Sequence, residues 1–108
     1  MGSGRRKVIW SAQAASALGE AVGYISADSP SAAIKLLETT LEVAVSLDVH
    51  AERGRVVPEL GSSTVRELFV FRYRLMYELT RDEVQIIAFV HGARDFAQWQ
   101  AEQHKDHE

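Results

Sequence analysis

The chain of 108 residues contains no cysteine and only two prolines. Without thiols the fold has no disulfides, and a thiolate metal site is excluded. The absence fits a reducing, cytoplasmic environment. No apolar run approaches the roughly 18–20 residues that a membrane-spanning helix requires. Nor does an apolar stretch of signal-peptide length follow the basic start of the sequence.

Positive charge is also scarce, because the formal net charge at pH 7 is −3. Proteins that bind the nucleic-acid backbone tightly usually present a broad basic surface. Residues 52–95 contain seven arginines, but seven acidic residues accompany them. This balance disfavours tight general binding to RNA or DNA and leaves a local arginine cluster as the main basic feature.

The composition is otherwise that of an ordinary globular protein, with 46 % hydrophobic and 25 % charged residues. A chain of this length buries one modest hydrophobic core but hardly two. We therefore expect a single domain.

The first half of the chain predicts a short strand followed by two helices. Residues 7–10 form an apolar run of strand type, and Ser11 is a suitable N-cap for a helix that begins at Ala12. The second helix is expected from Pro30 to about residue 48. Its predicted buried face consists of Ala33, Leu36, Leu37, Thr40, Leu41, Ala44 and Leu47. The two helices are predicted to form an αα-hairpin.

The second half of the chain predicts three antiparallel strands, over residues 65–70, 73–80 and 84–91. The last of them is apolar almost throughout, which is typical of a strand covered on both faces. Residues 49–59 are expected to be irregular, and residues 93–103 to form a final helix. The order is therefore β-α-α-β-β-β-(α), an α+β fold in which a two-helix hairpin packs on a small antiparallel sheet. The first strand is expected to pair with one of the later strands, because an isolated strand is unstable.

Few residues offer catalytic or ligand-binding chemistry. The imidazoles are His50, His91, His104 and His107, and a zinc site needs about three or four converging ligands. Solvated histidine is the interpretation favoured for them. The sequence has no Gly-x-Ser-x-Gly elbow, and Gly-Ser-Ser at residues 61–63 lacks the lysine and the following helix of a phosphate loop. We expect neither a metal nor a cofactor.

The arginines of the predicted sheet are the main functional candidates. Arg74 lies in mid-strand, where an arginine is usually a solvent-face residue or half of a cross-strand ion pair, here with Glu67. In the alternative interpretation, Arg66, Arg74, His91 and Arg94 converge at one end of the sheet and clamp a phosphate or a carboxylate surface. His91 is then a candidate general base. The large aromatic residues are instead interpreted as core: Trp10, Trp99, Phe69, Phe71 and Phe89.

Several short segments together resemble the ParE/RelE toxin superfamily of bacterial type II toxin–antitoxin pairs. They are residues 54–60 (GRVVPEL), 65–68 (VREL), 73–77 (YRLMY), 86–91 (IIAFVH) and 94–96 (RDF). Upstream, the strand that ends in Trp10, the pair Tyr24-Ile25 and residues 29–33 (SPSAA) agree with the same pattern. The resemblance covers roughly residues 7–96. It predicts one toxin domain over residues 1–108, with its core at 7–96 and flexible ends at 1–6 and 104–108.

The resemblance implies a compact fold of two helices against an antiparallel sheet. It also implies a cytoplasmic toxin that a cognate antitoxin holds inactive. ParE-type members of the superfamily poison DNA gyrase, whereas RelE-type members cut mRNA in the ribosomal A site. A further alternative is a toxin fold that has lost toxicity and survives as a binding module.

The residues favour the ParE branch. Ribonuclease members have a strongly basic surface, but the lysines here are Lys7, Lys35 and Lys105, and none of them lies in the predicted sheet. Some ribonuclease members use a Glu–Arg–His set, for which Glu59, Arg74 and His91 are the candidates, although His91 falls earlier than the family pattern. We therefore predict a gyrase inhibitor whose target-binding residues are Arg55, Arg66, Arg74, His91 and Arg94.

Overall fold

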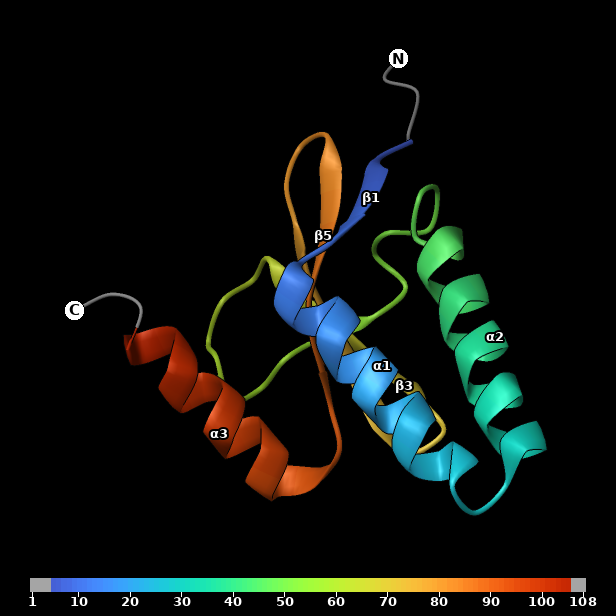
Figure 1. Ribbon diagram of the computed structural model, residues 1–108. Helices are drawn as coiled ribbons and strands as arrows, with labels where there is room; N and C mark the ends of the chain where they lie inside the picture. Colours follow the sequence, from blue (N-terminus) through green and yellow to red (C-terminus); the bar gives the residue numbers. More distant parts are fainter. Residues whose placement is uncertain (1–4, 106–108) are drawn as a thin grey trace.

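The computed structural model describes residues 5–105, with side chains as far as Gln103 (Figure 1). Of the ends predicted to be flexible, residues 1–4 and 106–108 lie outside the described residues, and His107 with them. The elements are β1 (Lys7–Trp10), α1 (Ala12–Ser26), α2 (Pro30–Ser46), β2 (Arg55–Val56), β3 (Val65–Val70), β4 (Tyr73–Leu79), β5 (Glu83–Val90) and α3 (Gly92–Lys105). The predicted order is confirmed, with β2 added inside the stretch that was expected to be irregular.

The strands form one sheet in the order β1-β5-β4-β3-β2. The pairs β2–β3, β3–β4 and β4–β5 are antiparallel. In contrast, β1 lies beside β5 and runs parallel to it, so the sheet is mixed and not purely antiparallel as predicted. No tight turn joins these two strands, because both helices and three strands lie between them in the sequence. Their pairing is therefore free of the constraint that makes hairpin neighbours antiparallel.

Local signals at the helix starts explain the α1–α2 hairpin. The Oγ atom of Ser11 accepts a hydrogen bond of 3.0 Å from the amide of Ala14. Ser29 caps α2 in the same way, over 3.2 Å to the amide of Ala32, and Pro30 occupies the first turn. These side chains satisfy amides that would otherwise lack partners within the helix. The connection is short because the second cap follows α1 almost immediately.

Two hydrophobic clusters pack on opposite faces of the sheet. The larger one joins α1 and α2 to the strands and includes Leu18, Leu36, Leu75, Ile86 and Phe89. The smaller one joins α3 to the other face and includes Met76, Ala88, Val90, Phe96 and Trp99. Neighbouring residues of β4 contribute to different clusters because successive side chains of a strand point to opposite faces. In Figure 1, α2 and α3 lie on either side of α1.

A register shift in the centre of the sheet explains the nearly continuous apolar run of β5. Tyr77 of β4 is opposite Ile86, but its neighbour Met76 is opposite Ala88. Ile87 is therefore the extra residue of a β-bulge. As a result, Ile86 and Phe89 both belong to the cluster under the helix hairpin although they are three positions apart.

Some core predictions are wrong, while others hold. Trp99 and Phe89 are buried as predicted and Trp10 is partly buried, but Phe69 and Phe71 are 58 % and 57 % exposed. These two residues lie at the tip of the β3–β4 hairpin, where the described chain provides no layer to cover them. Leu41, predicted on the buried face of α2, is also exposed, since it lies on the flank of the helix that turns away from the sheet. Within residues 5–105, no helix has both the length and the apolar character needed to cross a bilayer.

Candidate functional site

A buried carboxylate lies at the centre of the sheet face that α3 covers. Glu67 of β3 is only 1 % exposed. Its Oε2 accepts a hydrogen bond of 2.6 Å from Nε of Arg55, and its Oε1 accepts one of 2.6 Å from Nε of Arg74. Burying a carboxylate is unfavourable unless opposite charge and hydrogen bonds compensate it. The two arginines supply both, which confirms the cross-strand ion pair of Arg74 and Glu67 as the ordinary interpretation of Arg74.

The remaining nitrogens of Arg74 bind a second carboxylate. Its Nη2 donates to Oε1 of Glu59 over 2.9 Å, and its Nη1 donates to Oε2 of the same residue over 3.2 Å. The guanidinium also lies over the ring of Phe96 in α3, 4.6 Å from the ring centroid. Only 11 % of the Arg74 side chain is exposed. The arginine therefore joins three elements of the fold and leaves little of its charge for a ligand.

The shifts in the pKa values of Arg74 and Glu59 follow from this geometry. Desolvation by itself lowers the pKa of Arg74, but its hydrogen bonds to Glu59 and Glu67 outweigh the burial and raise the pKa above its ordinary value. The hydrogen bond from Arg74 lowers the pKa of the Glu59 carboxyl. Both groups are thus held in their charged forms at neutral pH. A general base works best when its pKa lies near the operating pH. The pKa of Glu59 is instead lowered, away from neutrality.

Arg66 lies on the other face of the sheet and has a structural role. Its Nη1 donates to the backbone oxygen of Gly54 over 2.8 Å and to that of Glu52 over 3.3 Å. Beside it, the hydroxyl of Tyr77 donates to the oxygen of Ala51 and accepts from the amide of Gly54. These bonds fix the stretch between α2 and β2 against the sheet.

His91 follows β5 and lies on the same face as the helix hairpin. Its ring is 4.9 Å from that of Tyr73, which in turn stacks on Phe89 at 4.7 Å. Its backbone amide donates to Oδ2 of Asp95 over 3.3 Å. Since Arg74 and Tyr73 are neighbours in β4, their side chains point to opposite faces. The structure therefore brings Glu59 and Arg74 together but separates both from His91.

The predicted convergence of arginines at one end of the sheet is wrong. Arg74 and Arg55 belong to the face under α3, whereas Arg66 and His91 lie on the other face, because alternate strand positions diverge. Arg94 is exposed in the first turn of α3. What was predicted as one cluster is an internal ion-pair network and a few separate exposed cations.

An open groove of about 760 Å³ lies on the helix-hairpin side, at the tip of the β3–β4 hairpin. Its apolar lining comes from α1, α2 and the strand ends, and includes Tyr24, Leu36, Phe71, Tyr73 and Phe89. The sequence analysis missed this groove. The available signals were the alanine-rich helix from Ala12 and an aromatic residue at the centre of a predicted turn.

The sequence analysis predicted Arg74 as the partner of Glu67, but it did not predict that Glu67 is buried and also binds Arg55. The available signal was its place between Val65 and Phe69, two apolar residues on the same strand face. In the part of the chain that the structure describes, no three acidic or histidine side chains gather in a way that could hold a metal ion.

Comparisons with known proteins agree with this architecture. A family model described as the ParE toxin of the type II toxin–antitoxin system, parDE, matches residues 8–96. The fold is similar to a solved chain of the chromosomal ParDE TA system from P. aeruginosa, with a TM-score of 0.68 and 21 % sequence identity. That similarity covers 84 % of this chain and 100 % of the other. No curated protein sequence matches the chain significantly. Because the family model spans most of the chain, this protein belongs to the ParE toxin family of type II toxin–antitoxin systems.

Proposed function

We propose that this toxin inhibits DNA gyrase by binding it, without catalysis, and that a cognate antitoxin neutralises it in the bacterial cytoplasm. The observation that carries the proposal is the saturation of Arg74 by Glu59 and Glu67. A ribonuclease needs a cation that is free to stabilise the charge developing on a phosphate. Here that cation is neutralised by two carboxylates and covered by Phe96.

The position of His91 supports the same proposal. In the alternative, ribosome-dependent mRNA cleavage, Glu59 or His91 would move protons while Arg74 stabilises the phosphate. A base and a charge stabiliser must reach the same reacting atoms, at about 3 Å. Because Arg74 and His91 lie on opposite faces of the sheet, these residues cannot act on one phosphate in this arrangement.

The exposed cations are the candidates for contact with gyrase. Arg94 and His91 are exposed beside the start of α3, and the side chain of Arg55 is 61 % exposed although its Nε binds Glu67. Arg66 and Arg74, the other predicted target-binding residues, are engaged in internal bonds. We assign the target contact to Arg94, His91 and Arg55 and a structural role to the other two.

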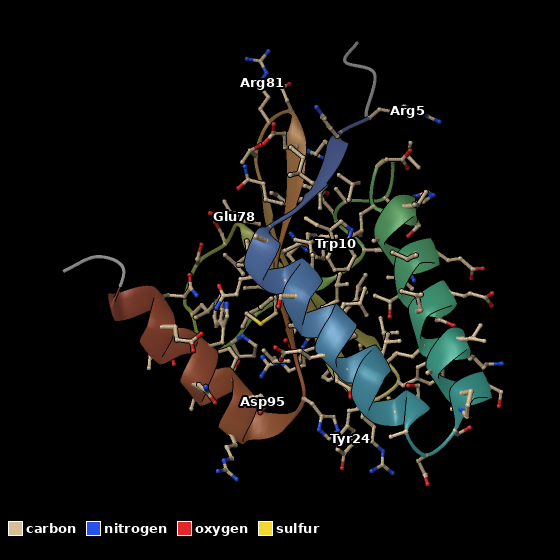
Figure 2. All side chains as sticks on the ribbon, viewed as in Figure 1. Arg5, Trp10, Tyr24, Glu78, Arg81 and Asp95 are labelled. Atoms are coloured by element: carbon tan, nitrogen blue, oxygen red, sulfur yellow. The ribbon has the colours of Figure 1, made fainter. Side chains whose placement is uncertain are left out.

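The test is a supercoiling assay with purified gyrase and the purified full chain. We expect inhibition of supercoiling together with accumulation of cleaved DNA. Arg94→Ala should weaken inhibition by about tenfold or more, as truncation of an interface arginine commonly does. Arg81→Ala is the matched control: Arg81 is likewise exposed, but it lies in the β4–β5 turn at the other end of the molecule from Asp95 in α3 (Figure 2).

Three results would contradict the proposal. Normal supercoiling at a large excess of toxin would remove gyrase as the target. New cuts at codons in a translating extract, mapped by primer extension, would instead establish the ribonuclease. Unaffected growth of cells that express the chain without an antitoxin would indicate a binding module that has lost toxicity.

A further inference from the structure

Helix α2 carries a stripe of large aliphatic side chains on the flank that turns away from the sheet. The stripe consists of Ile34, Leu41 and Val45, whose side chains are 57 %, 44 % and 65 % exposed. Residues seven and four positions apart lie in one line along a helix, so these three form a continuous apolar surface. Single exposed hydrophobic residues are ordinary, whereas a contiguous apolar surface marks an interaction site.

The fold of the single chain does not use this stripe. The opposite side of α2 already packs on the core through Leu36 and Ala44. Leu37, which is partly buried, lies between that side and the stripe, so the apolar surface runs without a break from the core to the flank. In Figure 1, α2 forms one flank of the molecule, with α1 on its inner side and no other described element beyond it. The stripe is therefore open to a partner.

The charges beside the stripe suit a second copy of the same helix. Lys35 and Glu42 are both exposed and lie two turns apart at the same angular position on α2. In an antiparallel helix pair about a two-fold axis, Ile34 of one copy can lie opposite Val45 of the other. Lys35 then lies less than one helical turn from Glu42 of the second copy, and the axis repeats this contact. The surface is thus complementary to itself in both shape and charge.

One polar residue interrupts the stripe. Glu38 is exposed and lies between Ile34 and Leu41 along the helix. A polar residue within an otherwise apolar helix seam fixes orientation and register and reduces the strength of association. Glu38 is therefore expected to weaken a helix pair without preventing it.

We propose that the α2 stripe is the interface of a homodimer in which two α2 helices pack antiparallel. Ile34 and Val45 of the two copies pack against each other, the Leu41 side chains lie near the two-fold axis, and Lys35 pairs with Glu42 across the interface. Two helices of 17 residues bury less than the roughly 800 Å² per partner of a standard interface. We therefore expect a dissociation constant of about 10–100 µM. The inference depends neither on gyrase nor on the antitoxin.

The test measures self-association of the purified full chain by analytical ultracentrifugation, from about 1 to 500 µM. Leu41→Lys should weaken the dimer by about tenfold or more, because it places a charge at the centre of the apolar contact. Val56→Lys is the matched control, because Val56 is 41 % exposed, close to the 44 % of Leu41, but lies in β2. Circular dichroism and urea denaturation check that both variants remain folded.

Two further sets of variants test the geometry of the pair. Lys35→Glu and Glu42→Lys should each weaken the dimer by about fivefold, because each creates two contacts between like charges. The double variant exchanges the two signs and should restore the affinity. Glu38→Leu should strengthen the dimer by about tenfold, because it completes the apolar seam.

Each other result overturns the proposal. A wild-type chain that is monomeric at 500 µM does so, as does a dimer that Leu41→Lys leaves unchanged or that Val56→Lys weakens equally. Failure of the charge exchange to restore the affinity rejects the antiparallel pairing. If the wild type is monomeric and Leu41→Lys instead weakens binding of the antitoxin or inhibition of gyrase, the stripe belongs to that partner.

Discussion

The Nε atom of Arg74 lies 2.6 Å from Oε1 of Glu67, and that carboxylate is almost completely buried. A second guanidinium, that of Arg55, approaches the other oxygen over the same distance. Buried charges of this kind are stable only as a set, because each member compensates the desolvation of the others. The network joins β2, β3 and β4, and Phe96 of α3 packs over it. It thus supports the sheet and orders the face that α3 covers.

The first prediction concerns removal of the buried charge. Glu67→Gln should lower the free energy of unfolding by about 3–5 kcal/mol, because two guanidinium groups lose their buried counter-charge. Glu59→Gln removes an exposed partner of the same arginine and should cost less than about 1 kcal/mol. Urea denaturation of both variants measures the difference. Equal destabilisation by the two substitutions would show that burial of Glu67 does not govern the network.

The second prediction concerns acid stability. The hydrogen bond from Arg74 lowers the pKa of Glu59 below its ordinary value of 4.5, so the folded state binds this proton less readily than the unfolded state. The contribution of Glu59 is therefore complete above pH 4.5 and is lost as the pH falls through the lower folded pKa. The difference in unfolding free energy between the wild type and Glu59→Gln should be constant near neutrality and shrink in acid. A difference that grows on acidification would have the wrong sign.

The third prediction concerns the contact between Gly54 and Tyr77. A Cβ atom at position 54 would lie 2.5 Å from the Tyr77 hydroxyl and 2.7 Å from the backbone oxygen of Glu67. Gly54→Ala should therefore destabilise the fold by about 1–3 kcal/mol through overpacking. Tyr77→Phe removes the nearer obstacle but leaves the amide of Gly54 without its partner, at a cost of about 1–3 kcal/mol.

The double variant separates these two effects. With Tyr77→Phe already present, Gly54→Ala should destabilise the fold less than it does in the wild type. Some destabilisation should remain, because the backbone oxygen of Glu67 is still in place. Denaturation of the four proteins of this cycle gives the coupling energy. Simple additivity of the two substitutions would contradict the contact.

The same hydroxyl gives a prediction at alkaline pH. Burial raises the pKa of Tyr77 above its ordinary value of 10.0. For an acid whose folded pKa is raised, the contribution to stability is complete below the unfolded pKa and is lost as the pH rises through the folded value. The wild type should therefore lose stability above about pH 10, measured by denaturation in a pH series, and Tyr77→Phe should lose less. Parallel curves for the two proteins would contradict the shift.

The order of elements was predictable from the sequence because its signals are local. Ser11, Ser29 and Pro30 mark helix starts, and alternation marks the strands in residues 65–80. The direction of β1 was not predictable, since no turn constrains it and its partner β5 is distant in the sequence. Strand β2 was missed because two residues carry no periodicity.

The site was less predictable than the fold, because the position of a side chain depends on strand register. The pairing of Arg74 with Glu67 follows from local alternation and was anticipated. Its further contacts with Glu59 and Phe96 come from a loop and from α3, whose placement the sequence does not reveal. The separation of His91 from Arg74 depends on the end of β5, where the chain leaves the sheet for α3.

The last prediction concerns the backbone at Phe71, whose φ angle of 55° suits asparagine better than phenylalanine. Phe71→Asn should raise the free energy of unfolding by about 0.5 kcal/mol, because asparagine tolerates the left-handed conformation and the ring makes limited contacts. Phe71→Ala removes the same ring without that tolerance and should lower stability or leave it unchanged. Thermal unfolding of both variants measures the difference, about 2–4 °C for each 0.5 kcal/mol in a domain of this size. An alanine variant as stable as the asparagine variant would show that the backbone at Phe71 is not strained.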